Sequence, residues 1–153
     1  MIVKLACYRL TAFVLASLLL AASGCGEKPS QADIVISDAV MPVPAPGQAT
    51  AAVYLALSNN GTDTLVINHI SAPVAEHIEV HRNLYEDGMM KMRPVNHLMI
   101  NPGSRLLFTP GGYHLMVFGM ANPLKSGDSF PITIEFEGGK SVTAAVAVKP
   151  LSL

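Results

Sequence analysis

Cysteine is nearly missing from this sequence: of its 153 residues only Cys7 and Cys25 are cysteines, and both lie near the N-terminus. The rest of the chain, from Gly26 to Leu153, contains no thiol. A domain built from this region cannot contain a disulfide, so it must be stabilised by its core and by strand pairing. Any metal site in this region must likewise be built without thiolate ligands.

Positive charge and tryptophan are also scarce. Charged residues make up 14% of the sequence, Trp is absent, and Lys and Arg form no cluster. Without Lys4 and Arg9, which lie in the N-terminal segment, eight Lys and Arg face eleven Asp and Glu, a net charge of −3. Phosphate binding requires a clustered positive surface, so the sequence argues against a nucleic-acid partner.

Residues 1–24 have the plan of an export signal. Lys4 and Arg9 supply positive charge, and Leu10 to Ala22 is an apolar run too short to span a bilayer comfortably. The run ends in Ala-Ser-Gly before Cys25, which resembles the lipobox of bacterial lipoproteins. The resemblance implies cleavage before Cys25 and lipidation of that residue. The alternative is an ordinary secretory leader whose cleavage region happens to contain a cysteine.

The remaining roughly 130 residues are the length of one domain with a single core. We expect residues 25–32 to be the lipidated cysteine and a polar tether, and residues 33–150 to be the domain. Gly26 stands directly after the cysteine, which resembles the signal for outer-membrane sorting in a Gram-negative cell. We therefore expect a periplasm-facing domain anchored by lipid to the membrane, and to the outer membrane in particular.

Beyond the tether the sequence predicts an all-β domain. Short runs of Val, Ile, Thr, Leu and Tyr alternate with Gly, Pro, Asn and Asp, and no stretch has a sustained helical period. So many short strands favour an antiparallel sandwich or barrel, and we expect a cupredoxin-like Greek-key arrangement, although the pattern does not fix the strand order. The expected strands are Ile34–Ala39, Ala51–Ser58, Thr64–Ser71, Glu76–Arg82, Met89–Arg93, Arg105–Phe108, His114–Phe118, Phe130–Glu137 and Ser141–Lys149.

Histidine and methionine are concentrated in one stretch. Between His77 and Met120 the sequence has four of its five His and six of its eight Met. Thioether sulfur is a soft donor and imidazole a borderline one, so a mixed set favours Cu(I) over hard ions such as Mg²⁺ or Ca²⁺. Methionine is also a common core filler, so the composition does not by itself establish a site.

The spacing of these residues adds to the argument. His114 and Met116 lie two residues apart in an apolar run that should be a strand. Side chains at positions i and i+2 of a strand share one face and lie about 6.5–7 Å apart, so both could bend toward one ion. The apolar alternation in residues 77–81 likewise places His81 on the polar face of its strand.

These residues resemble the signature of the PCuAC-type periplasmic copper chaperones, which is His, ten residues, Met, twenty-one residues, then His-x-Met. His81, Met92, His114 and Met116 stand at those separations. Residues 87–95 and 111–116 also read like the corresponding blocks of that family. The resemblance covers most of the chain after residue 33.

The resemblance implies a cupredoxin-like fold that binds one Cu(I) through His81, Met92, His114 and Met116. It also implies delivery of copper to an acceptor in the envelope, such as a respiratory oxidase subunit or a thiol-bearing assembly factor. Two imidazoles and two thioethers are neutral, so they leave the charge of Cu⁺ uncompensated and should bind it less tightly than thiolates do. A site of this kind also suits an oxidising compartment, where a chaperone cysteine could be lost to a disulfide.

The other histidines and methionines match no ligand position. We expect packing or rim roles for Met89, Met90, Met99 and Met120, a place beside the site for His77, and surface or turn positions for His69 and His97. The pair His77 and His81 around Glu79 is not a zinc-protease motif. The glutamate is misplaced for that motif, and residues i and i+4 of a strand lie about 13 Å apart.

Two other functions stay open. A blue-copper electron carrier would share the fold, but it needs a cysteine thiolate at the copper. A metal-free binding or structural lipoprotein of the envelope would use its methionines only for packing. No nucleophile set, phosphate loop or carboxylate pair stands out, so we expect a carrier and not an enzyme.

Overall fold

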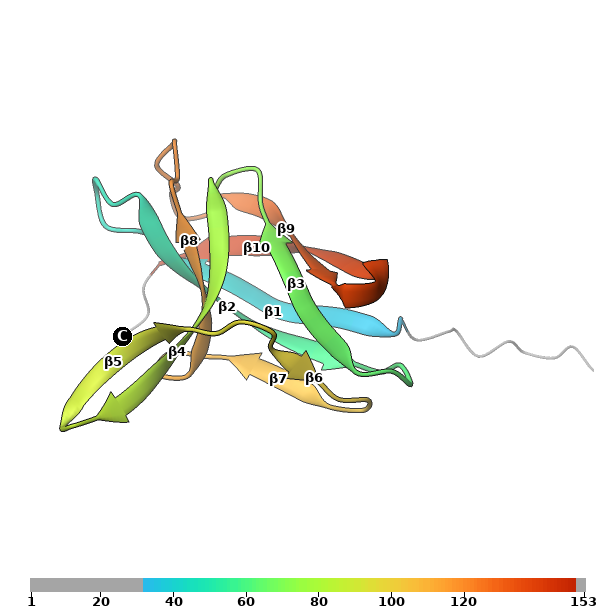
Figure 1. The fold of residues 1–153 in the computed structure, drawn as a ribbon. Helices are drawn as coiled ribbons and strands as arrows, with labels where there is room; N and C mark the ends of the chain where they lie inside the picture. The colour runs from blue at the N-terminus through green and yellow to red at the C-terminus, as the bar shows by residue number, and fades with distance from the viewer. Residues whose placement is uncertain (1–31, 151–153) are drawn as a thin grey trace, which may run out of the picture. The chain divides into compact units, whose positions relative to one another are not determined.

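The computed structural model describes residues 32–150, so the predicted export signal and Cys25 lie outside the described residues. Residues 32–150 lie within one compact unit. Within the described range, no helix is long and apolar enough to cross a membrane. The elements are β1 (Ile34–Pro42), β2 (Thr50–Asn59), β3 (Leu65–Ser71), β4 (His77–Glu86), β5 (Met89–Pro94), β6 (Met99–Ile100), β7 (Arg105–Phe108), β8 (Tyr113–Phe118), β9 (Ser129–Phe136), the 3₁₀ turn η2 (Glu137–Gly139) and β10 (Ser141–Lys149) (Figure 1).

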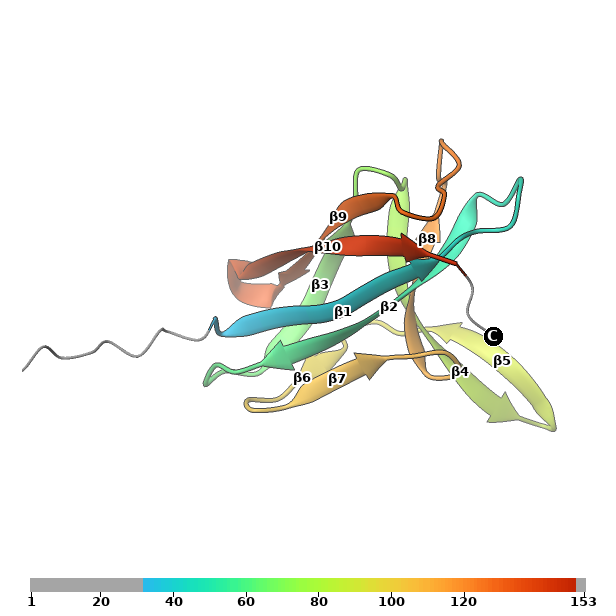
Figure 2. The ribbon, with the colours of Figure 1, turned by 180° about the vertical axis from the view of Figure 1, so that it is seen from behind.

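The strands form one curled sheet with the order β5-β4-β8-β7-β2-β1-β10-β9-β3-β6 and an additional pairing of β8 with β2. β3 also packs against β4, so the two ends of the sheet approach each other (Figures 1 and 2). β2 and β3 follow each other in the chain but are separated in the sheet by β1, β10 and β9. Such crossing connections are those of Greek-key barrels, and the predicted all-β barrel is confirmed.

The pairing differs from the purely antiparallel arrangement that the sequence favours. β1 pairs with β10 in parallel, and β7 makes a single parallel pairing with β8. Residues 99–100 add the short strand β6, which is not among the predicted strands because two residues carry no alternation pattern. β4 continues to Glu86, four residues beyond the predicted end at Arg82, and therefore forms a long hairpin with β5.

The core lies inside the curl of the sheet. Along β8, Leu115 and Val117 are fully buried, and they align with Val80 and Ile78 of β4, which are 7% and 8% exposed. Alternate residues of these two strands therefore line the core, as predicted. The residues between them point to the opposite face, which is the face of the histidines.

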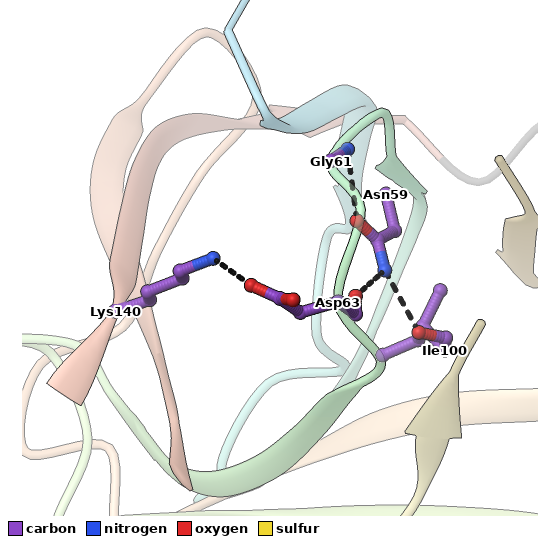
Figure 3. Close-up of polar contacts among 5 residues, drawn as sticks. All are labelled: Asn59, Gly61, Asp63, Ile100 and Lys140. Carbon is purple, nitrogen blue, oxygen red and sulfur yellow. Dashed lines mark hydrogen bonds and ion pairs between the residues drawn. The ribbon is translucent and has the colours of Figure 1, made fainter. Parts of the chain in front are cut away.

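A buried asparagine joins the loops at one end of the barrel (Figure 3). Asn59 is 1% exposed, and its side-chain amide donates hydrogen bonds to the carbonyl oxygens of Asp63 at 2.8 Å and Ile100 at 2.9 Å. Its Oδ1 accepts a hydrogen bond from the backbone N–H of Gly61 at 3.1 Å. Lys140 in turn donates to the Asp63 carboxylate at 3.2 Å. These bonds attach the turn after β2 to β6, so they explain how a strand of two residues is held in place.

Candidate metal centre

The pairing of β4 with β8 brings two of the predicted ligands directly opposite each other. His81 aligns with His114, and Glu79 aligns with Met116. Opposed residues of an antiparallel pair, and residues two positions along, share one face of the sheet. His81, His114 and Met116 therefore project from the same face, and the ring centroids of the two histidines lie 6.0 Å apart.

The hairpin partner β5 adds Met92 to this face. Met92 lies opposite Asn83, and the residue opposite His81 is Pro94. Met92 on β5 is therefore a diagonal cross-strand neighbour of His81. Met116 on β8 is the corresponding diagonal neighbour on the other side of β4. Diagonal neighbours lie about 7–8 Å apart, within reach of a flexible thioether side chain. The four residues share one face around His81, and their role as ligands stays a prediction.

The turn before β8 fixes the start of the His114 strand. Gly112 donates its N–H to the carbonyl of Thr109 at 3.0 Å, and Thr109 donates its N–H to the carbonyl of Tyr113 at 2.7 Å. Gly111 has a φ of +78°, a conformation that side chains other than glycine rarely adopt. The turn at residues 110–112 therefore leads directly into β8, which begins at Tyr113 next to His114.

His81 and His114 each have one ring nitrogen that is hydrogen-bonded and one that has no partner among residues 32–150. His114 donates Nδ1–H to the carbonyl of Gly112 at 3.2 Å, and His81 donates Nε2–H to Oε2 of Glu79 at 2.7 Å, because both oxygens can only accept. The remaining nitrogens, Nε2 of His114 and Nδ1 of His81, are buried and have no hydrogen-bond partner among residues 32–150. A buried polar atom without a partner costs about 1–3 kcal/mol, and each of these carries a lone pair that a metal ion could use.

The four residues differ strongly in exposure. His114 is 3% exposed and the His81 side chain 13%, whereas Met116 is half-buried and Met92 is 48% exposed. His114 is buried although it lies on the face opposite that of Leu115 and Val117. The two imidazoles thus form the inner part of the face and Met92 the outer part.

Phe118 and His77 lie beside the histidine pair. The His77 ring stacks on Phe118 with centroids 4.6 Å apart, and the His81 ring lies 6.0 Å from the same phenylalanine. His77 is therefore a neighbour of the site, as expected. His69 and His97 are exposed, also as expected. Of the other methionines in the expected rim or packing set only Met120 is buried, at 9%, while Met89, Met90 and Met99 are exposed.

Glu79 is a further residue of this face, and the sequence patterns did not place it in the site. Its carboxylate accepts a hydrogen bond from His81 and lies 3.9 Å from Nε2 of His77. The structure thus places a carboxylate beside the four predicted ligands, which are themselves neutral. The available signal was its position two residues before His81, because strand alternation places residues i and i+2 on one face.

Comparison with known proteins finds lipoproteins that are similar in sequence and solved PCuAC-type structures that are similar in fold. Residues 34–148 match the family model described as "Putative lipoprotein LpqE-like". Over 153 residues the chain is 29% identical to "Putative lipoprotein Lxx21020" of Leifsonia xyli subsp. xyli, a match that spans 94% of this chain and 91% of that protein.

The solved structures establish the fold. The copper-bound PCuAC domain from PmoF2 matches with a TM-score of 0.65 and 19% identity over 77% of this chain and 93% of that domain. The solution structure of CuI-DR1885 from Deinococcus radiodurans matches with a TM-score of 0.61 and 23% identity over 84% of each chain. The predicted resemblance to PCuAC-type domains, and with it the cupredoxin-like fold, is confirmed at the level of the fold.

Proposed function

The chain belongs to the LpqE-like lipoprotein family, and from this premise we propose that it is a copper carrier of the cell envelope. One Cu(I) would bind to His81, Met92, His114 and Met116 on the face formed by β4, β5 and β8. The observation that carries the proposal is the pair of buried imidazole nitrogens without hydrogen-bond partners among the described residues, on a face that also presents two thioethers.

The hydrogen bonds of the two rings decide which atoms would hold the ion. His81 would bind through Nδ1 and His114 through Nε2, since the opposite nitrogens donate to Glu79 and Gly112. Carboxylates and carbonyls that accept from the far nitrogen of a ligand histidine fix its tautomer and its ring orientation. Imidazole and thioether together favour Cu(I) over hard cations. Two proteins of similar fold, the copper-bound PCuAC domain from PmoF2 and CuI-DR1885, support this choice of ion.

Copper is the cargo in this proposal, not a catalyst. Met92 is 48% exposed, so ligands of another protein could reach the ion from outside. The acceptor would be a copper protein of the envelope, such as a respiratory oxidase subunit or a thiol-bearing assembly factor. Neutral nitrogen and sulfur donors would release the ion to thiolates, which bind it more tightly.

One titration separates this function from its two rivals. The soluble chain that starts at Ala32 forms a compact unit of its own and can be titrated with Cu(I) against a chromophoric competitor. Stoichiometric, colourless binding is the expected result. An intensely blue Cu(II) form would favour an electron carrier, and the absence of binding would favour a metal-free structural lipoprotein.

Acidification should weaken Cu(I) binding. Copper binds imidazole only in its neutral form, so protons compete with the ion at both histidines, whereas thioether sulfur does not titrate. Between about pH 8 and pH 5, the interval in which histidine normally changes charge, affinity should fall with a limiting slope of up to two protons per copper. The competitor titration, repeated at several pH values and corrected for protonation of the competitor, measures this slope.

The double variant His81→Ala/His114→Ala is the control for the pH effect. It should bind Cu(I) weakly through the two methionines, with little dependence on pH in the same interval. A wild-type affinity that stays flat from pH 8 to pH 5 would mean that the two histidines are not both ligands.

A lipid at Cys25 would hold the carrier at the membrane with its domain in the periplasm, at the outer membrane by the predicted sorting. The family description and the name of the Leifsonia relative are both those of lipoproteins, which supports this placement. Cys25→Ser should move the protein out of the membrane fraction or leave an uncleaved precursor, whereas Cys7→Ser should not. Cell fractionation with mass determination of the N-terminus tests this. A wild-type protein that is fully soluble and starts at another residue would contradict it.

A further inference from the structure

The β4–β5 hairpin carries another thioether on the face of the proposed ligands. Within this hairpin Tyr85 pairs with Met90, Asn83 with Met92, and His81 with Pro94. Alternate residues of a strand share a face, so Met90, Met92 and His81 project together. Met89 pairs with Glu86 and points to the opposite face.

The donors on this face become more exposed toward the tip of the hairpin. The exposed fraction rises from 3% at His114 and 13% at the His81 side chain to 48% at Met92 and 63% at Met90. The hairpin projects from the barrel in both views of the molecule (Figures 1 and 2). Met90 and Met92 therefore extend the same face of the sheet from the exposed tip of the hairpin to the buried imidazole nitrogens.

Met90 and Met92 are close enough for one ion to move directly from the sulfur of one to the sulfur of the other. Residues i and i+2 of a strand lie about 6.5–7 Å apart, and the unbranched methionine side chain has three rotatable bonds. A packing role does not account for Met90, because its side chain is largely in solvent. Its neighbour Met89 has the same side chain and a similar exposure of 59%, but it points to the face opposite the proposed ligands. Met89 is therefore the matched control for Met90.

We propose that Met90 is a transient Cu(I) ligand that takes the ion from Met92 during release and hands it to Met92 during loading. The proposal rests on the copper-carrier function. In each step one copper–sulfur bond forms as a bond between copper and another donor breaks, and copper stays in the +1 state throughout. No proton is released, because thioether sulfur carries none. The ion thus never has to leave all protein ligands at once, so Met90 lowers the barrier to transfer without being a ligand of the resting site.

The test compares Met90→Leu with Met89→Leu in the soluble chain that starts at Ala32. Leucine nearly conserves the volume of methionine and lacks its sulfur, so both variants should fold normally. Two quantities are measured: the equilibrium affinity by competitor titration, and the rate of Cu(I) transfer to excess bicinchoninate by stopped flow. Met90→Leu should keep the affinity and slow transfer about tenfold, the effect of raising the transfer barrier by about 1.4 kcal/mol. Met89→Leu should change neither quantity.

The outcomes separate this inference from the proposed function. A wild-type protein that binds no Cu(I) would overturn both. Normal binding with an unchanged transfer rate in Met90→Leu would overturn the transient ligand and leave the carrier function standing. Equal slowing by Met89→Leu, or a loss of affinity in Met90→Leu as large as in Met92→Leu, would also overturn the transient role of Met90.

Discussion

His114→Ala should weaken Cu(I) binding by more than about 100-fold, since losing a residue that merely orients a metal ligand already costs about 10–100-fold. The Nε2 atom of His114 is buried and has no hydrogen-bond partner among residues 32–150, and His114 lies opposite His81 in the strand pair. Competitor titration measures the loss. His69→Ala is the matched control, because His69 is exposed on β3 and should leave the affinity unchanged.

A second substitution keeps this prediction independent of folding. His114 is 3% exposed, so removal of its ring could loosen β8 as well as the site. Met116→Leu removes a half-buried sulfur at nearly constant volume, and should also weaken Cu(I) binding while costing less than about 1.5 kcal/mol of stability. Met99→Leu removes the sulfur of a residue that is 66% exposed and outside the four-ligand set, and should leave the Cu(I) affinity unchanged. Equal losses of affinity from all three changes would contradict the assignment.

Asn59→Ala should lower the free energy of unfolding by roughly 2–4 kcal/mol, because it removes three hydrogen bonds of a buried side chain, and each contributes about 0.5–1.5 kcal/mol. The substitution removes the donor to the carbonyls of Asp63 and Ile100 and the acceptor for the N–H of Gly61. Urea unfolding of the copper-free protein measures the change. Asn60→Ala is the control: Asn60 is exposed, and within the described part of the chain its side chain makes one hydrogen bond, to the carbonyl of Ala32.

If the buried amide of Asn59 holds β6 in place, the losses of unfolding free energy in Asn59→Ala and Asn60→Ala should differ by at least about 1 kcal/mol. Surface substitutions usually change this free energy by no more than about 0.5 kcal/mol. Similar values for both would mean that the loops at this end of the barrel are held by other contacts. Asn59 is not among the four proposed ligands, so its substitution should leave the Cu(I) affinity of the folded protein unchanged.

Most strands could be predicted because their apolar residues alternate, and β8 is the clearest case. Leu115 and Val117 are fully buried where the alternation places them. Alternation is a local property, so it could not reveal that β1 pairs in parallel with β10, which lies at the other end of the domain sequence. Nor could it reveal β6, which depends on the hydrogen bonds of Asn59.

The spacing of His and Met residues in the sequence identified the four candidate ligands, but it did not show their hydrogen bonds or their burial. The bond from His81 to Glu79 and the burial of His114 depend on the cross-strand register of β4 and β8. The register of the hairpin is more local. Asp87 and Gly88 both have positive φ, as in the two-residue turns that close β-hairpins. An Asp-Gly pair between two strands is a sequence signal for such a turn, so the sequence contained the information that Met90 and Met92 share the face of His81.

X-ray absorption at the copper edge of the stoichiometrically loaded protein tests the central claim most directly, because it reports the donor atoms around the ion. The structure places two imidazoles and two thioethers on one face, with Nδ1 of His81 and Nε2 of His114 free of hydrogen bonds to residues 32–150. The predicted spectrum therefore contains two imidazole nitrogens and two sulfurs around Cu(I). A first shell without sulfur, or without imidazole, would contradict the site at His81, Met92, His114 and Met116.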